Sequence, residues 1–82
     1  MVSIGFGNSV RASGIDVIVQ PDSAPIKRLV TDARAVNKLI DATQGRKTRA
    51  VIIMTSGKIV LSALQAETIA SRAEHRSDME KT

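Results

Sequence analysis

Apolar residues near the N-terminus fall in short runs that are interrupted by glycines. The segment VSIGFGNSV at residues 2–10 contains two short extended pieces around the turn-forming residues 5–8. Residues 14–19 then alternate partly between apolar and polar side chains, which is typical of a strand. We therefore predict a hairpin-like β section followed by a third strand.

Residues 24–38 have the spacing of an amphipathic helix. Ser23 or Asp22 can accept a hydrogen bond from the first free N–H groups, and Pro25 fits the first turn. Apolar side chains then recur three and four positions apart, which predicts one face toward a core and a basic outer face. The predicted core stripe consists of Ile26, Leu29, Val30, Ala33 and Val36, and the outer face of Lys27, Thr31, Arg34 and Lys38.

The second half of the chain predicts three strands and a helix. Residues 39–43 and 49–54 read as a hairpin whose connection contains Gly45, a residue that tolerates the positive φ of a short turn. A second turn over 55–58 leads to a strand over 59–64, which would complete a three-stranded meander. A short helix from residue 66 to about 76 and a polar, fraying tail over 77–82 would follow. The predicted class is α+β, with a small antiparallel sheet in a single domain over residues 1–76.

The strand AVIIM at residues 50–54 is apolar at every position, which indicates burial of both faces of the sheet. The first helix can cover one face. The C-terminal helix offers only Ile69 and a few alanines, so cover for the other face looks thin. This interpretation predicts an obligate homo-oligomer in which a partner subunit completes the burial.

Composition excludes several classes of protein. The 82 residues hold no cysteine and a single histidine, so they cannot build a disulfide framework, a thiolate zinc site or a histidine-based triad. The longest apolar stretch, residues 50–54, is far shorter than the roughly 20 residues that cross a bilayer. The N-terminus lacks a basic region followed by an apolar core, so no signal peptide is predicted. We expect a cytoplasmic protein without metal, cofactor, membrane partner or small-molecule substrate.

The net charge of +4 is concentrated in the middle of the chain. Residues 24–50 hold seven Lys and Arg against two Asp, a net +5, which leaves −1 for the remainder. A localised basic segment favours an anionic partner. The single aromatic residue, Phe6, argues against single-stranded nucleic acid, whose binding relies on aromatic stacking platforms. The backbone of duplex DNA requires no aromatic residue.

The segment GRKTR at residues 45–49 is the strongest functional candidate. Arg46, Lys47 and Arg49 would form an exposed cluster that neutralises phosphates. The alternative is an ordinary solvated hairpin whose charges discourage edge-to-edge pairing of strands. Composition does not choose between the two interpretations.

Other candidate sites are weaker. Gly5-Phe6-Gly7 begins like a dinucleotide-binding fingerprint, but the third glycine and the following helix are absent. Phe6 is better placed in the core or between subunits. No pair of carboxylates has a spacing that predicts catalysis, so we expect no enzyme. The carboxylates considered are Asp16, Asp22, Asp32 and Asp41.

Four segments together resemble the RemA family of bacterial extracellular matrix regulators. They are IGFGN at residues 4–8, PDSAPIKRLVTDAR at 21–34, LIDATQGRKTRAVIIMTSG at 39–57 and VLSALQAETIASR at 60–72. The resemblance implies a DNA-binding regulator of biofilm matrix genes, associated with the nucleoid. It also implies a homo-oligomeric ring of about seven subunits that wraps double-stranded DNA around a basic rim.

The resemblance assigns roles to particular residues. The two cations after the glycine, here Arg46 and Lys47, would bind DNA, while Pro25 would be a structural or assembly residue. Arg28 and Arg49 are weaker candidates for DNA contact. The family favours a second arginine where this chain has Lys47, which keeps the charge but loses a bidentate fork.

One further departure concerns the segment before the third strand. The family tends to carry a basic residue at or near Gly14, where this chain has none, and Arg11 lies close enough to substitute.

The leading hypothesis is a duplex-DNA-binding regulator that acts as a ring. The alternative is an RNA- or ribosome-associated structural module that uses the same basic face. An enzyme that binds a nucleotide or another small molecule ranks third.

Overall fold

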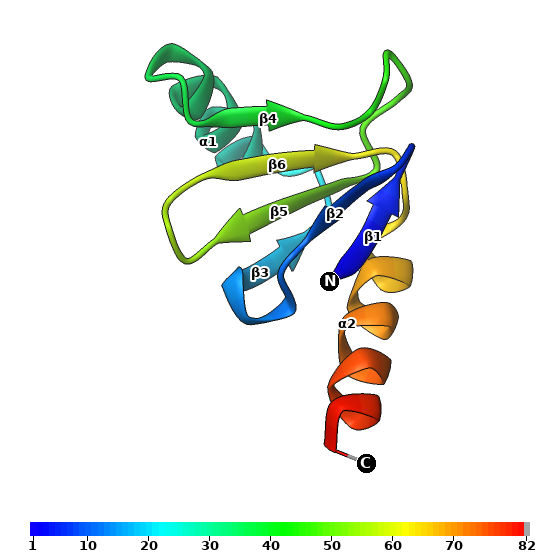
Figure 1. Ribbon diagram of the computed structural model, residues 1–82. Coiled ribbons are helices and arrows are strands. Elements are labelled where there is room, and N and C mark those ends of the chain that lie inside the picture. The colour runs from blue at the N-terminus through cyan, green and yellow to red at the C-terminus, as the bar shows by residue number, and fades with distance from the viewer. Residues whose placement is uncertain (82) are drawn as a thin grey trace.

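The computed structural model describes the backbone of residues 1–81 and the side chains of residues 1–74. Strands β1 and β2 form a two-stranded sheet, and the other four strands form a second sheet in the order β3-β5-β6-β4 (Figure 1). The class is therefore α+β, as predicted, but with two sheets. In chain order the elements are β1 (Val2–Gly5), β2 (Asn8–Val10), the short 3-10 helix η1 (Ala12–Gly14), β3 (Ile15–Val19), α1 (Ala24–Ala35), β4 (Leu39–Asp41), β5 (Ala50–Met54), β6 (Ile59–Ser62) and α2 (Ala66–Lys81).

The predicted N-terminal hairpin is present as β1 and β2, which pair antiparallel. Its two central turn residues, Phe6 and Gly7, have φ of 54° and 78°. Positive φ at both positions is the feature of a type I′ turn, whose twist matches that of the flanking strands. The Asn8 side-chain amide donates to the carbonyl of Gly5 at 3.3 Å and so closes the turn.

The predicted meander is wrong in its first pair of strands. β4 does not pair with β5; it pairs parallel with β6, while β5 lies between β3 and β6 with antiparallel neighbours. The sheet is therefore mixed. Because β5 is apolar at every position, it requires cover on both faces of the sheet, which an interior strand receives. The three-residue β4, with Ile40 and Asp41 exposed, suits an edge. The predicted turn over residues 55–58 does join β5 to β6.

Helix α1 begins as predicted, and the Ser23 hydroxyl accepts from the N–H of Ile26 at 3.4 Å. It ends at Ala35 and not at residue 38, because Asn37 adopts a φ of 58°. The N–H of Lys38 then bonds the carbonyl of Ala33 at 2.8 Å, which is the Schellman arrangement.

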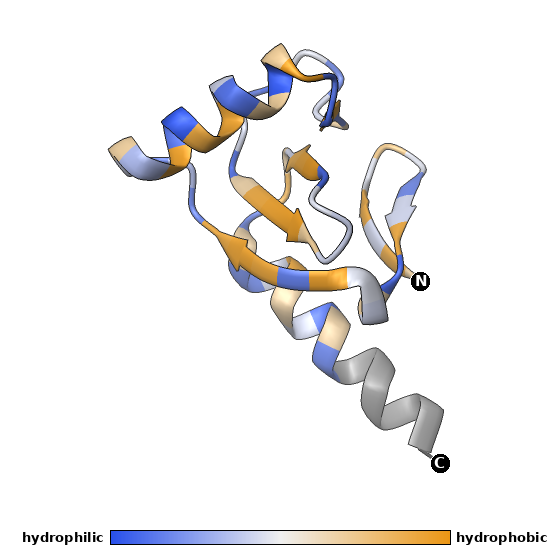
Figure 2. Cartoon of the chain, turned by 90° about the vertical axis from the view of Figure 1, so that its left-hand side faces the viewer, coloured by the Kyte–Doolittle hydropathy of each residue, from blue (hydrophilic) through white to orange (hydrophobic). Residues whose placement is uncertain are grey.

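The early end of α1 shortens the predicted core stripe. Val36 leaves the stripe and is 62% exposed. Up to Ala33 the stripe packs against the sheet, and Figure 2 shows the hydrophilic residues of α1 on the side that faces away. The amphipathic prediction is thus confirmed for the helix itself and wrong for the residue beyond its end.

Both faces of the central strand are covered within one chain. Val51 packs under α1, and Ala50 and Ile52 pack under the two-stranded sheet and α2, with all three side chains 0% exposed. The expectation that cover for one face is thin is therefore wrong. Sequence reasoning missed that Val2 and Ile4 of β1 join Ile69 of α2 over this face.

Helix α2 runs from Ala66 to Lys81, past its predicted end near residue 76. The predicted fraying of residues 77–82 falls outside the residues whose side chains are described. Within the described part of the chain, neither helix is long and apolar enough to cross a membrane.

Ser62 at the end of β6 joins the two sheets. Its buried hydroxyl donates to the carbonyl of Ile4 at 2.8 Å and accepts from the N–H of Leu64 at 3.1 Å. Its own carbonyl accepts from the N–H of Arg49 at 2.8 Å. One residue thereby holds β1, the chain leading to α2, and the start of β5 in a fixed relation.

We predict that Ser62→Ala lowers the free energy of unfolding by about 1–3 kcal/mol, because a buried carbonyl and a partly buried N–H lose their partner. Urea denaturation followed by circular dichroism measures this change. Ser56→Ala, in the exposed turn between β5 and β6, is the matched control and should leave stability within about 0.5 kcal/mol. Equal stabilities of Ser62→Ala and the wild type would contradict the assigned role.

Candidate nucleic-acid interface

The loop between β4 and β5 arches over the end of β6. The N–H of Ala42 donates to the carbonyl of Leu61 at 3.0 Å, and the N–H of Arg49 donates to the carbonyl of Ser62. Both ends of the loop are therefore fixed to the same strand end, which the path of the chain in Figure 1 shows. The predicted two-strand hairpin is replaced by a bridge from an edge strand to an interior strand.

A tight turn forms the top of this loop. The N–H of Arg46 donates to the carbonyl of Thr43 at 3.0 Å. Gln44 and Gly45 between them have φ of 55° and 79°, so the predicted positive φ at Gly45 is confirmed. Because the backbone reverses at this point, Arg46 and Lys47 are presented to solvent, as predicted.

Asp41 organises the foot of the loop. Its Oδ1 accepts hydrogen bonds from the hydroxyl of Thr43 and from the N–H of Thr43, the latter at 2.9 Å. The Thr43 hydroxyl, then its N–H, and more weakly the charge of Arg34 hold the pKa of Asp41 below its ordinary value, against a small opposing effect of burial. Asp41 therefore stabilises the adjoining turn.

The three predicted cations meet at one surface hollow of about 420 Å³. Arg46, Lys47, Arg49 and Ala63 line it. All three cations are exposed, and no carboxylate belongs to the lining. A row of phosphates could therefore approach without opposing charge, and the N–H groups at the positive end of α2 begin only three residues beyond Ala63.

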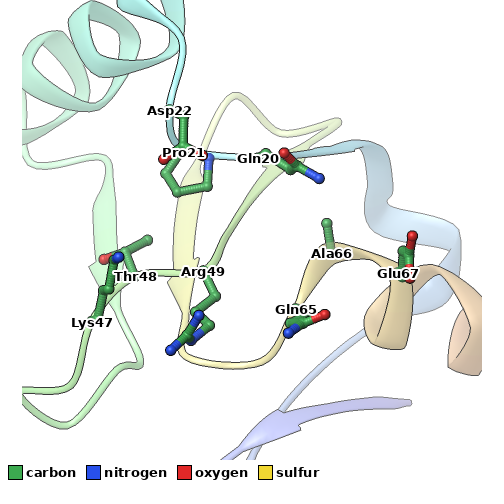
Figure 3. A pocket seen from close by; sticks show the side chains of 9 residues that line it. All are labelled: Gln20, Pro21, Asp22, Lys47, Thr48, Arg49, Gln65, Ala66 and Glu67. Carbon is green, nitrogen blue, oxygen red and sulfur yellow. The ribbon is translucent and has the colours of Figure 1, made fainter.

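A second groove, of about 290 Å³, adjoins this hollow on the side of α2. Figure 3 shows Lys47 and Arg49 on one wall, Asp22 from the connection between β3 and α1, and Glu67 from the first turn of α2. Gln65 lies between the cationic wall and the helix. Two carboxylates offset the two cations there, so this groove favours anions less than the hollow beside it.

The remaining candidates lie apart. Pro25 lies in the first turn of α1, consistent with a structural role, and Arg28 is exposed in the next turn. The carbonyl of Arg11 accepts from the N–H of Gly14 at 3.0 Å. The carbonyl of Gly14 in turn accepts from the N–H of Thr55. Thr55 follows the far end of β5, so Arg11 and the loop lie at opposite ends of that strand.

Phe6 is not in the core; the residue is 48% exposed at the tip of the N-terminal hairpin. The Arg46 guanidinium carbon lies 5.6 Å from the centre of this ring, a cation–π contact. The tip of the two-stranded sheet and the basic loop are therefore neighbours, and both appear at the same end of the molecule in Figure 1. Sequence reasoning missed this contact, because residues 6 and 46 carry no common local signal.

Metal-ligating side chains do not gather within the described residues; no three His, Cys, Asp or Glu lie close enough to hold an ion. On the described surface, the functional side chains that lie together are the cations of the loop between β4 and β5.

Comparison with known proteins identifies the family of the chain. The family model described as RemA-like, extracellular matrix regulatory protein A-like, matches residues 1–73. The chain belongs to the RemA-like family. A relative in Dictyoglomus thermophilum is 64% identical over 74 residues, which cover 90% of this chain and 87% of the relative.

Two further relatives extend the similarity to other bacteria. One from Trichormus variabilis is 57% identical over 81 residues, with 94% of this chain and 92% of the relative covered. One from Geobacillus sp. is 55% identical over 78 residues, with 95% and 90% covered. All three relatives carry the name "Putative regulatory protein". The RemA-like family and these names support a regulatory role for the chain.

The lowered pKa of Asp41 predicts a pH dependence of stability. A carboxyl group whose pKa is lower in the folded state stabilises the fold above the unfolded-state value and loses that contribution as pH falls through the folded value. Asp41→Ala should therefore destabilise the protein at pH 7, and the difference from the wild type should shrink below pH 3.8, the ordinary value for this group. Thermal unfolding between pH 2 and pH 7 measures both.

Asp22→Ala is the control for this prediction, because Asp22 is an exposed aspartate outside the loop. A destabilisation by Asp41→Ala that stays constant over the whole pH range would show that the charge of Asp41 has no role.

Proposed function

We propose that this RemA-like protein is a regulator that binds the phosphate backbone of duplex DNA through the loop between β4 and β5. The observation that carries the proposal is the surface hollow that Arg46, Lys47 and Arg49 line together. No carboxylate belongs to its lining. Each cation that meets a phosphate releases condensed counterions, which favours association. Since a single loop is too small to read many base edges, selectivity would come mainly from the deformability of the DNA.

Three cations are few for tight binding, so we further propose that several copies act together in a closed ring. Repetition of the loop around a rim would raise avidity without new contacts in each subunit. In such a ring of about seven subunits, duplex DNA would follow the rim. Regulation of matrix genes and association with the nucleoid belong to the same proposal, which rests here on the resemblance to the family.

The edges of the four-stranded sheet support self-association. β3 and β4 form the two edges, and each exposes one apolar side chain, Val17 at 43% and Ile40 at 46%. Exposed edge strands that carry apolar side chains are prone to contact other chains. Because the two edges differ, contact between them is heterologous, and such a contact closes into a ring when its rotation permits.

We predict that Arg46→Ala combined with Lys47→Ala weakens binding to duplex DNA by about 100-fold or more, because the loss repeats in each subunit. The combination of Lys38→Ala and Lys58→Ala removes the same charge from the opposite end of the sheet and should bind within a few-fold of the wild type. Fluorescence anisotropy with a labelled duplex measures both affinities.

The same measurement over a range of salt concentrations tests the role of phosphates. Wild-type affinity should fall steeply between about 50 and 200 mM salt, and the loop variant should show a shallower slope. Equal losses in both double variants would show that net charge, not the loop, governs binding. Tighter binding to structured RNA than to a matched duplex in competition would favour the RNA-associated alternative.

We predict that Val17→Glu and Ile40→Glu each shift the protein from an oligomer toward a monomer. A charge at either edge would be desolvated in the contact, and each copy in a ring uses both edges. Multi-angle light scattering measures the mass. Ser56→Glu, in the exposed turn between β5 and β6, adds the same charge away from the edges and should leave the mass unchanged. An unchanged oligomer in both edge variants would exclude the edge contact.

A further inference from the structure

Phe6 occupies a position that packing within the chain does not explain. It is the only aromatic residue of the protein, yet almost half of its surface is exposed. Its φ of 54° lies in the left-handed region, which residues other than glycine, asparagine and aspartate rarely adopt. An aromatic side chain that is almost half exposed and held in a strained turn contributes less to a core than a buried one, and such strain points to a further role.

The ring of Phe6 lies under the guanidinium of Arg46, whose carbon is 5.6 Å from the ring centre. A cation within about 6 Å of the ring centre is attracted by the electron density of the aromatic face. A planar guanidinium can make this contact and keep several N–H donors free for another acceptor. The pairing with Phe6 is therefore compatible with simultaneous contact between Arg46 and a phosphate.

The hairpin that carries Phe6 is fixed to the body of the protein independently of Arg46. The carbonyl of Ile4 accepts from the buried Ser62 hydroxyl at 2.8 Å. A Cβ at Gly5 would lie 3.5 Å from the Leu64 side chain, so the backbone there approaches the chain after β6 closely. Ser62 thus fixes the position of the hairpin that carries the Phe6 side chain. The same residue also bonds the end of the loop at Arg49.

We propose that Phe6 is a positioning residue for DNA binding: its ring holds the Arg46 guanidinium in the orientation that meets a phosphate. A long arginine side chain on a solvent-exposed loop otherwise loses rotamer freedom when it binds. Holding the guanidinium beforehand reduces that loss. This inference rests on the proposed DNA-binding function, and it adds a role for the two-stranded sheet in the same site.

A double-mutant cycle tests the proposal. Phe6→Leu should weaken duplex binding by about 2- to 5-fold per loop, the range expected for an exposed cation–π contact, and by more where several loops bind together. Phe6→Tyr, which keeps an aromatic face, should restore affinity to near the wild-type value. In the Arg46→Ala background, Phe6→Leu should have no further effect, because the group that it positions is absent.

Failure of this inference is distinguishable from failure of the proposed function. If Arg46→Ala weakens binding but Phe6→Leu weakens it equally in both backgrounds, Phe6 acts independently of Arg46 and the inference is wrong. Equal loss in Phe6→Tyr and Phe6→Leu would also overturn it. If Arg46→Ala leaves binding unchanged, the DNA-binding assignment of the loop itself fails.

A second measurement requires neither DNA nor a folded variant. Protons of the Arg46 side chain that lie over the face of the Phe6 ring should have upfield-shifted NMR resonances in the wild-type protein. Where Phe6→Leu folds, which thermal unfolding and light scattering establish, these resonances should return toward random-coil positions. Random-coil shifts for Arg46 in the wild type would overturn the proposal.

Discussion

The hydroxyl of Ser62 is the joint on which the arrangement of the molecule depends. It is buried at the end of β6, where it bonds β1 on one side and the chain leading to α2 on the other. The carbonyl of the same residue accepts from the N–H of Arg49, the last residue of the basic loop. This bond fixes the point where the loop enters β5, next to the contact between the two sheets. The contact between Phe6 and Arg46 follows from this joint, since the hairpin and the loop are both fixed to one strand end.

The loop separates the groups that hold its shape from the groups that face solvent. Asp41 and Thr43 satisfy each other at its foot, and Thr43 is buried. The side chains of the loop cations are exposed, and the hydrogen bonds that form the turn do not involve them. These cations are Arg46, Lys47 and Arg49. A stable backbone with free cations suits phosphate contact, because ordering the loop on binding then costs little conformational entropy.

The extent of successful prediction follows from how local each signal is. The Ser23 cap, Pro25 and the turn before Lys58 are written in adjacent residues, and each predicted element formed there. The pairing partner of β4 was not predictable from the adjacent residues. A connection that contains glycine indicates that the chain reverses, but it does not indicate that the strands before and after it pair with each other. The three cations were found from charge alone, whereas the contribution of Phe6 depends on a contact across forty residues that no local pattern contains.

Burial of the central strand changes the physical basis of the proposed assembly. A subunit with one bare sheet face would be driven to associate by a large apolar area, and its partner could attach through the same face to give a symmetric dimer. In this chain β1, β2 and α2 cover that face, and the most exposed apolar side chains of the four-stranded sheet, Val17 and Ile40, lie on its two unlike edges. Such edges favour head-to-tail contact. The N-terminal hairpin therefore has two consequences: it closes the core that would otherwise direct face-to-face pairing, and it brings its aromatic tip to the loop that a ring would repeat.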